Sequence, residues 1–271
     1  MKLIAFDLDG TTLIEHKYIS ERNMQAFRTA LKKNILLVPA TGRLHSFMPK
    51  AVLEIGDIPY FITSNGASVY DCQHNTCIYS NYLDMDTTVW VLEYLSTQNV
   101  YFELYIQGEV YIIDEPIENI LKKLAVKEKE AFFLQKTFVK VKDFFKLLEE
   151  KKIGPEKINL PSIPVKLRNK IWEYLSSFKE IKLTSSFPQN IEINNATANK
   201  GNALKFLSEK LNIKPEEIFA VGDNGNDIEM LKHAGISVAM GNASQEVKKI
   251  AAYITDSCEE NGVAKAIEKF I

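Results

Sequence analysis

Close to the N-terminus, a short apolar run ends abruptly in an acidic turn. Leu3 to Phe6 are all apolar, and Asp7-Leu8-Asp9-Gly10-Thr11 follows directly. A continuous apolar run of this length is typical of a parallel strand that is covered on both faces. The pattern of an apolar run followed by a polar turn returns at residues 35–39, 60–63, 218–221 and 236–239. We therefore expect an α/β fold built on a doubly wound, mostly parallel sheet.

Helical segments are expected between these runs. Residues 19–33 carry apolar residues at helical spacing, with Ser20 suited to the N-cap and Asn34 suited to a left-handed residue after the last turn. A second helix is expected over residues 44–53. The run at 60–63 is predicted to be a third strand of the same sheet.

The middle of the chain follows a different pattern. The strand-like runs at 101–106 and 110–113 are separated by the turn signal Gln107-Gly108, which predicts an antiparallel hairpin. We expect residues 1–82 and 194–271 to form the α/β core. Residues 83–193 are then an α+β domain inserted into that core.

Composition excludes several classes of protein. Of 271 residues, 46% are hydrophobic and 25% are charged, which is typical of a globular chain and excludes intrinsic disorder. A formal net charge of −2 gives no reason to expect a nucleic-acid partner. Because no window approaches the roughly 18 apolar residues of a membrane helix, no membrane partner is expected either.

The cysteines indicate a reducing compartment. The three cysteines form no CxxC pair, and no histidine lies at zinc-ligand spacing from two of them. A disulfide between Cys72 and Cys77 within a hairpin is the minor alternative. Together with the absence of a leader ahead of Leu3, these features predict a cytoplasmic protein.

Four carboxylates follow apolar runs that we expect to be neighbouring strands: Asp7, Asp9, Asp223 and Asp227. In an open parallel sheet, ligands bind at the carboxyl ends of the strands, so these side chains are expected to converge. Clustered carboxylates raise one another's pKa, and a hard divalent cation relieves that repulsion. All-oxygen ligands point to Mg²⁺, which in proteins commonly serves phosphoryl oxygens.

Lys200 lies at the expected start of a helix and supplies a compensating positive charge. Gly10 and Gly42 allow the backbone to approach an anion closely. Asp and Gly also occupy strand-to-helix turns for purely structural reasons. That explanation suffices for one such turn, but not for three turns at three strand ends together with the lysine.

The motifs of this sequence resemble those of the haloacid dehalogenase superfamily of phosphotransferases, and the resemblance covers essentially the whole chain. The core elements are Asp7-Leu8-Asp9-Gly10-Thr11, Thr41, Lys200 and Gly222-Asp223 followed by Asp227. Further matches resemble its Cof-type phosphatase branch, and these are Ala40-Thr41-Gly42-Arg43, Ser64-Asn65-Gly66-Ala67, Asn199 to Leu204 and Ala239 to Ala243. Thr12 departs from the usual Leu. The inserted segment is placed like the large α+β cap of that branch, which sets substrate specificity.

The resemblance implies roles for the acidic residues. Asp7 is the nucleophile, forms an aspartyl-phosphate and ligates Mg²⁺. Asp9 is the general acid and then the base, and its backbone carbonyl ligates the metal. Asp223 is a further metal ligand. Asp227 holds an outer-shell water or orients Lys200.

The resemblance also implies a phosphate-binding set. Thr41 and the backbone amides of Leu8 and Gly42 bind phosphoryl oxygens, Lys200 neutralises the transferring group, and Asn226 reaches the phosphate. Phosphoryl transfer needs this positioning and charge neutralisation more than acid–base power.

The expected function is Mg²⁺-dependent hydrolysis of phosphate monoesters of small metabolites, such as sugar phosphates, by a monomer or weak homodimer. One alternative is a phosphomutase acting on hexose phosphates with the same core. Another is a non-catalytic protein that binds phosphorylated metabolites.

For Arg43 two roles are expected: it pairs with a carboxylate or it contacts substrate. The histidines have no catalytic or metal partner at a recognisable spacing, and these are His16, His45, His74 and His233.

Overall fold

The computed structural model describes residues 1–125, 137–185 and 188–271, and these form two compact units. The first unit contains Met1–Ser80 and Asn199–Ile271, and the second contains Asn81–Ala198. Each unit has its own cluster of buried apolar side chains. Within the described residues, no helix combines the length and the apolar character needed to cross a membrane.

A five-stranded parallel sheet forms the centre of the first unit, with the strand order β14-β13-β12-β1-β2. Its strands are β1 (Leu3–Phe6), β2 (Leu36–Pro39), β12 (Ile218–Gly222), β13 (Ile236–Ala239) and β14 (Tyr253–Ile254). The helices of this unit are α1 (Glu21–Lys32), α2 (Lys50–Leu53), α8 (Lys200–Lys210), α9 (Ile228–His233), α10 (Gln245–Ile250) and α11 (Gly262–Phe270). Short 3₁₀ turns are η1 (His45–Phe47), η2 (Ser64–Gly66), η3 (Pro215–Glu217), η4 (Gly225–Asp227) and η5 (Cys258–Glu260).

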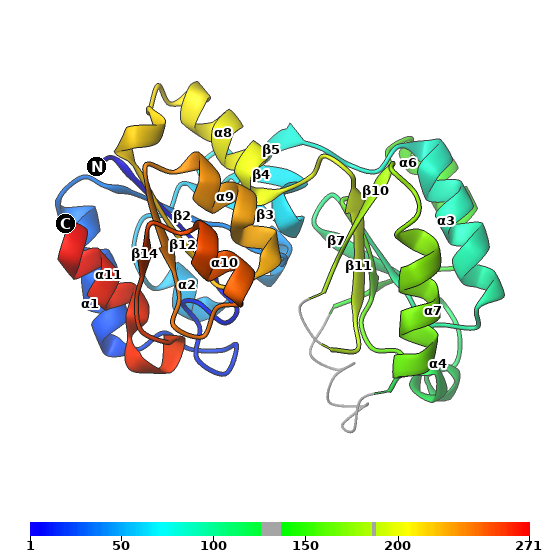
Figure 1. Cartoon of the computed structure of the whole chain (residues 1–271). Helices are drawn as coiled ribbons and strands as arrows, with labels where there is room; N and C mark the ends of the chain where they lie inside the picture. The colour runs from blue at the N-terminus through cyan, green and yellow to red at the C-terminus, as the bar shows by residue number, and fades with distance from the viewer. Residues whose placement is uncertain (126–136, 186–187) are drawn as a thin grey trace. The chain divides into compact units, whose positions relative to one another are not determined.

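Helices cover both faces of this sheet. Figure 1 shows α1 and α11 side by side on one face, with α8, α9 and α10 on the other. The chain leaves β1 towards β2 on one side, and β12 lies beside β1 on the other side. The winding direction therefore reverses between β1 and β12, which confirms the doubly wound prediction and creates the crevice where such sheets bind ligands.

Helix α1 has the predicted caps. The Ser20 side chain accepts a hydrogen bond from the Asn23 N–H at 3.2 Å, and Asn34 is left-handed with φ 59°. Phe27 of α1 packs on Phe6 of β1, with ring centroids 4.5 Å apart. Such a pair adds about 0.5–1.5 kcal/mol beyond its buried area, so it fixes α1 against the strand that leads to Asp7.

Two sequence expectations need correction in this unit. The run at 60–63 is β3 (Tyr60–Thr63), which belongs to an antiparallel sheet with β4 (Ser68–Asp71) and β5 (Thr76–Ser80). It pairs with the segment after β2 in one isolated parallel bridge, between Ala40 and Ile62. The apolar run alone could not reveal this, because the tight turn after Thr63 sends the chain straight back along β3.

The helix expected over residues 44–53 is broken into η1 and α2. Pro49 is the cause, because a proline disfavours helical conformation in the residue before it. Met48 is accordingly extended, with φ −65° and ψ 126°, and α2 begins only at Lys50.

The second unit contains a six-stranded mixed sheet with the order β10-β11-β9-β6-β7-β8. Its described elements are α3 (Met85–Thr97), β6 (Glu103–Ile106), β7 (Glu109–Ile113), α4 (Ile117–Lys123), β8 (Val139–Val141), α6 (Phe144–Lys151), β9 (Lys157–Leu160), α7 (Val165–Leu175), β10 (Ile181–Thr184) and β11 (Ile191–Asn195). The predicted hairpin is present as the antiparallel pair β6 and β7. Strand β11 runs past residue 193, where the sequence placed the end of the insert.

Alternation along these strands gives the sheet two different faces. Leu104, Ile158 and Ile193 belong to the apolar cluster of the unit, whereas their neighbours Glu103 and Asn159 are buried polar residues. Glu103 accepts hydrogen bonds from the phenols of Tyr101 and Tyr105 and from the Asn159 amide, at 3.2, 3.0 and 2.8 Å. One face is therefore an apolar packing surface, and the other carries a hydrogen-bonded polar network.

Candidate active site

Asp7 and Asp223 lie on neighbouring loops at the carboxyl edge of the parallel sheet. Phe6 pairs with Val221 in the register of β1 and β12, and the Asp7 N–H donates to the Val221 carbonyl at 3.0 Å. Asp7 therefore leaves the sheet beside the end of β12, which Asp223 follows directly. Their position coincides with the reversal of winding direction in the sheet.

Lys200 connects the first and last acidic motifs. It is the first residue of α8, whose N-cap Asn199 accepts a hydrogen bond from the Asn202 N–H at 2.8 Å. The Lys200 side chain is completely buried, and its Nζ lies 2.5 Å from Asp7 Oδ1 and 2.6 Å from Asp227 Oδ1. A charged lysine is stable in such a place only because two carboxylates surround it.

Asp227 uses both of its carboxylate oxygens within the protein. Oδ1 accepts from Lys200, and Oδ2 accepts from the backbone N–H groups of Asp223 and Asn224 at 2.9 and 3.0 Å. Gly222 permits this arrangement, because a Cβ there would lie 2.5 Å from the Asp227 Cγ. Asp227 thus holds both the lysine and the loop that carries Asp223.

The electrostatics of this cluster are unfavourable without a further positive charge. Burial raises the pKa of Asp7 well above its usual value, and the charges of Asp227 and Asp223 add to this effect against the opposing charge of Lys200. Burial and the charge of Asp227 raise the pKa of Asp223 to about 6. Burial alone would lower the pKa of Lys200, but Asp227 and Asp7 outweigh it and raise that pKa.

A divalent cation fits the donors of this cluster. Asp7, Asp223 and Asp227 each offer a carboxylate oxygen, and these oxygens lie within 4.8 Å of one another. When all three are ionised, Lys200 leaves an excess of two negative charges, which one divalent cation balances. The donors are all oxygen, as Mg²⁺ prefers. Within this cluster, both oxygens of Asp227 already accept hydrogen bonds from the protein.

The loop after β1 is pressed against Asp223. Gly10 has φ 84°, and a Cβ at this position would lie 2.6 Å from Asp223 Oδ2. Thr11 donates its hydroxyl to Asp223 Oδ1 at 2.8 Å, and the Asn242 amide donates to the Gly10 carbonyl at 2.8 Å. Asn242 belongs to one of the motifs noted in the sequence, and here it braces the acidic loop.

Asp9 is held by two basic side chains. Arg43 Nε lies 2.8 Å from Asp9 Oδ2 and Arg43 Nη2 lies 2.5 Å from Oδ1, while His16 Nδ1 lies 2.8 Å from Oδ1. Burial alone would raise the pKa of Asp9, but the hydrogen bonds from Arg43 and His16 take it well below its usual range. Asp9 is therefore a carboxylate in this arrangement. Of the two roles considered for Arg43, the structure shows the carboxylate pairing.

The sequence offers no catalytic or metal partner for His16 at a recognisable spacing, and the structure places its ring against Asp9. Glu15 and His16 both have positive φ, 50° and 59°, and this turn brings His16 back onto Asp9. The hydrogen bond to Asp9 raises the pKa of His16. No spacing rule identifies such a contact, because it depends on two left-handed residues that are not glycines. His74 also has a partner, since its Nδ1 lies 2.9 Å from Asp71 Oδ2.

The second motif lies on the segment that follows β2. Thr41 is fully buried, its N–H donates to the Ile62 carbonyl at 2.9 Å, and its Oγ1 accepts from the Arg43 N–H at 3.2 Å. Leu8 and Gly42 follow β1 and β2, two strands that pair in parallel, so both lie at the same edge of the sheet. Asn226 lies in η4, one residue before Asp227, and its amide bonds Asn65.

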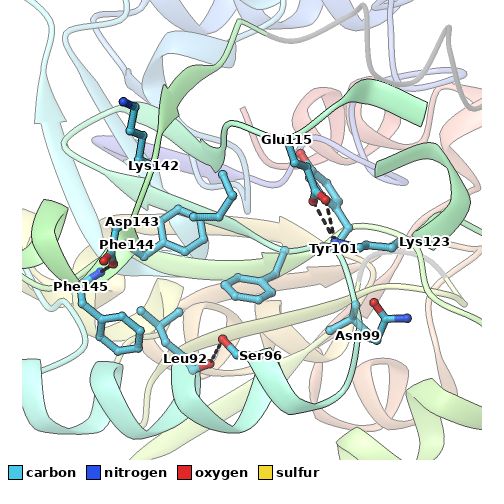
Figure 2. A pocket seen from close by; sticks show the side chains of 13 residues that line it. Leu92, Ser96, Asn99, Tyr101, Glu115, Lys123, Lys142, Asp143, Phe144 and Phe145 are labelled. Atoms are coloured by element: carbon cyan, nitrogen blue, oxygen red, sulfur yellow. Dashed lines mark hydrogen bonds and ion pairs between the residues drawn. The ribbon is translucent and has the colours of Figure 1, made fainter. Parts of the chain in front are cut away.

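A separate pocket of about 400 Å³ lies within the second unit (Figure 2). Phe102, Phe144 and Tyr101 contribute aromatic walls, and an ion pair between Lys123 and Glu115 lies at one side, with nitrogen–oxygen distances of 2.8 and 3.0 Å. None of the predicted site residues lines this pocket.

All three cysteines are free, so the alternative of a disulfide between positions 72 and 77 is not realised in the structure.

Comparison with known proteins places the chain in a family. Residues 4–267 match the family model of the haloacid dehalogenase-like hydrolases. Two proteins of Bacillus subtilis (strain 168), both named 5-amino-6-(5-phospho-D-ribitylamino)uracil phosphatase, are each 33% identical over all of this chain, which covers 96% of one (YcsE) and 98% of the other (YwtE). A solved structure of a haloacid dehalogenase-like hydrolase from B. subtilis superposes with a TM-score of 0.84 at 31% identity, and the match covers both chains completely. The carboxylate cluster and its buried lysine thus lie in a chain that belongs to the haloacid dehalogenase-like hydrolases, and its named relatives are phosphatases.

Proposed function

We propose that this protein is a Mg²⁺-dependent phosphatase that hydrolyses phosphate monoesters of small metabolites through an aspartyl-phosphate on Asp7. One observation carries the proposal: the fully buried Lys200 bridges Asp7 and Asp227 beside Asp223. A nucleophilic carboxylate with a fixed ammonium next to it provides both the attacking group and the charge neutralisation that phosphoryl transfer requires.

In the first step, an oxygen of Asp7 attacks the phosphorus as the bond to the leaving oxygen breaks. The departing alkoxide takes a proton from Asp9, and the product alcohol leaves. Lys200 balances negative charge on the transferring group, and Thr41 with the amides of Leu8 and Gly42 binds the phosphoryl oxygens. Asn226 contributes its amide to the same oxygens.

In the second step, water attacks the aspartyl-phosphate, Asp9 takes a proton from that water, and phosphate leaves with Asp7 restored. The carboxylate form of Asp9, which Arg43 and His16 stabilise, is the form this step needs. The first step needs protonated Asp9. We therefore expect a bound substrate to replace one of these basic contacts with its leaving oxygen.

The metal is best accommodated by Asp7 and Asp223, together with the backbone carbonyl of Asp9. Bound there, Mg²⁺ would supply positive charge to the phosphoryl oxygens. Asp227 is better placed to orient Lys200 than to ligate the metal, because its two oxygens already accept three hydrogen bonds.

The names of two relatives support an inference about the substrate class. Both are named for a phosphorylated ribitylaminouracil, and both match the whole of this chain. We infer that this protein also acts on phosphomonoesters of polyols, sugars or related small molecules. The second unit, as an inserted cap, would select among them.

Phosphate release from a panel of such compounds tests the proposal. The panel includes 5-amino-6-(5-phospho-D-ribitylamino)uracil, hexose 6-phosphates and a hexose 1-phosphate, each with Mg²⁺ and with EDTA. Asp7→Asn should reduce kcat by about 10³-fold or more while the fold is retained, because it removes the attacking charge. Asp57→Asn, an exposed site, is the matched control and should remain active.

Three results would contradict the proposal. Activity in EDTA equal to that in Mg²⁺ would refute the metal requirement. More than a tenth of wild-type turnover in Asp7→Asn would refute the aspartyl-phosphate. Conversion of the hexose 1-phosphate into hexose 6-phosphate without free phosphate would identify a mutase instead.

A further inference from the structure

The turn after β3 has an unusual backbone. Ser64 and Asn65 are successive left-handed residues with φ 51° and 60°, and Gly66 follows with φ 89°. All three are buried, and Asn65 is only 2% exposed. Residues other than glycine rarely adopt a left-handed backbone conformation, although asparagine tolerates it better than most.

This turn contacts three separate segments of the proposed active site. The Asn65 N–H donates to the Thr41 carbonyl at 3.0 Å, and the Ser64 N–H donates to the Arg43 carbonyl at 2.9 Å. A Cβ on Gly66 would lie 2.2 Å from the Asn199 carbonyl group and 2.6 Å from the backbone nitrogen that follows it. The turn therefore lies directly against the start of the helix that carries the buried lysine.

The third segment, which carries Asn226, is contacted through a side chain. Asn226 donates from Nδ2 to Asn65 Oδ1 at 3.1 Å, across 161 positions of sequence. An amide nitrogen carries two N–H groups, so the bond to Asn65 orients the group and leaves the other N–H for a second acceptor. Asn226 itself is half-buried in η4, a turn of three residues.

We propose that Asn65 is a positioning residue for the phosphate site, acting through the amide of Asn226. This inference rests on the proposed function only in taking Asn226 to bind phosphate. Glycine would satisfy the left-handed backbone at position 65 without strain. The asparagine side chain is therefore not required by the backbone, and its hydrogen bond to Asn226 supplies the reason for an amide at this position.

A double-mutant cycle tests the coupling. Asn65→Gly keeps the left-handed backbone accessible and removes only the amide, and Asn226→Ala removes its partner. The primary readout is the Kd of inorganic phosphate with Mg²⁺ present, measured by calorimetry. Asn65→Gly should weaken phosphate binding about tenfold, the size expected when a hydrogen bond to a charged group is lost or misaligned. In the Asn226→Ala background, the same change should have no further effect.

The control is another left-handed asparagine. Asn34 has φ 59° and is exposed at the end of α1, so Asn34→Gly makes the same chemical change outside the site. It should leave phosphate binding unchanged. The thermal midpoint is measured for every variant, and Asn65→Ser, which keeps a polar group in the turn, replaces Asn65→Gly in the cycle if the glycine variant is not folded.

Each result supports or overturns the inference. Equal weakening by Asn65→Gly in both backgrounds would show that Asn65 acts independently of Asn226, and unchanged phosphate affinity would remove it from the site. Phosphate binding is measured without turnover, so a coupled cycle in a protein that hydrolyses nothing would uphold the positioning role and refute the phosphatase. Turnover with an uncoupled cycle would do the reverse.

Discussion

At the scale of single residues, the site is organised by the way carboxylates are used. Asp227 and Asp223 are four positions apart and have opposite environments. Both oxygens of Asp227 accept hydrogen bonds, from Lys200 and from two backbone N–H groups, whereas Asp223 accepts a hydroxyl bond from Thr11 and retains a raised pKa. The bonds to Asp227 make it a support for the lysine, and the repulsion that Asp223 experiences is the kind that a nearby cation relieves.

This difference predicts how Asp223 affects stability. Its folded pKa of about 6 lies above its ordinary value, so its stabilising contribution is complete below about pH 4 and is lost as the pH rises through 6. Without metal at pH 7.5, Asp223→Asn should therefore raise the melting temperature by about 2–4 °C. Mg²⁺ should stabilise the wild-type protein at pH 7.5 and have much less effect on this variant.

Thermal melts at pH 5 and pH 7.5, with Mg²⁺ or EDTA, measure both effects. Asn can still accept the Thr11 hydroxyl, so the variant tests charge rather than a lost hydrogen bond. Asp57→Asn provides the exposed control. A lower melting temperature for metal-free Asp223→Asn at pH 7.5 would contradict the repulsion argument.

At the scale of elements, close backbone approaches bring the motifs together. The loop after β1 reaches Asp223 because Gly10 has no side chain and takes a positive φ. The turn η2 reaches the start of α8 because of Gly66. In both places a loop from one strand packs onto a residue that follows another strand or begins a helix, which local propensity alone does not encode.

Gly10→Ala tests this dependence. The new Cβ would meet Asp223 Oδ2 at 2.6 Å, and alanine disfavours φ 84°. We expect a loss of stability of about 1 kcal/mol or more and a fall in kcat of roughly tenfold or more, because Asp223 must shift. Urea unfolding and phosphate-release assays measure the two losses.

Gly225→Ala is the matched control, since a Cβ at Gly225 would have no heavy atom within 4 Å. It should be close to wild type in both assays. Wild-type activity in Gly10→Ala would show that the loop can move away from Asp223 without consequence.

At the scale of the whole molecule, the two units have separate apolar clusters, and both tryptophans lie in the second. Trp90 belongs to α3 and Trp172 to α7, and each packs against the cluster of that unit. The proposed metal ligands belong to the first unit. Tryptophan emission therefore reports on one unit, while circular dichroism reports on both.

This separation predicts a difference between probes. Mg²⁺ should raise the urea midpoint seen by circular dichroism and leave the tryptophan midpoint in place, because ligand binding stabilises only the folded unit that binds it. Asp223→Asn should remove the shift. An equal shift in both probes would show instead that the two units unfold as one cooperative body.

The fold class could be predicted because its signals are local. Short apolar runs, helical spacing and the caps at Ser20 and Asn34 each depend on a few neighbouring residues, and the parallel core that they imply is present. The errors arose where a neighbour overrode the pattern. Pro49 interrupted a helix, and the turn after Thr63 converted an expected parallel strand into an antiparallel one.

The sequence by itself determined that acidic turns follow strands that share one edge, because parallel strands end at a common edge whatever the loops do. Which atoms meet at that edge was decided by the tertiary structure alone. Lys200 reaches Asp7 across 193 positions, and Asn226 reaches Asn65 across 161. His16 reaches Asp9 through a left-handed turn. Such contacts depend on backbone dihedrals and on close packing between loops, and neither leaves a periodic trace in the sequence.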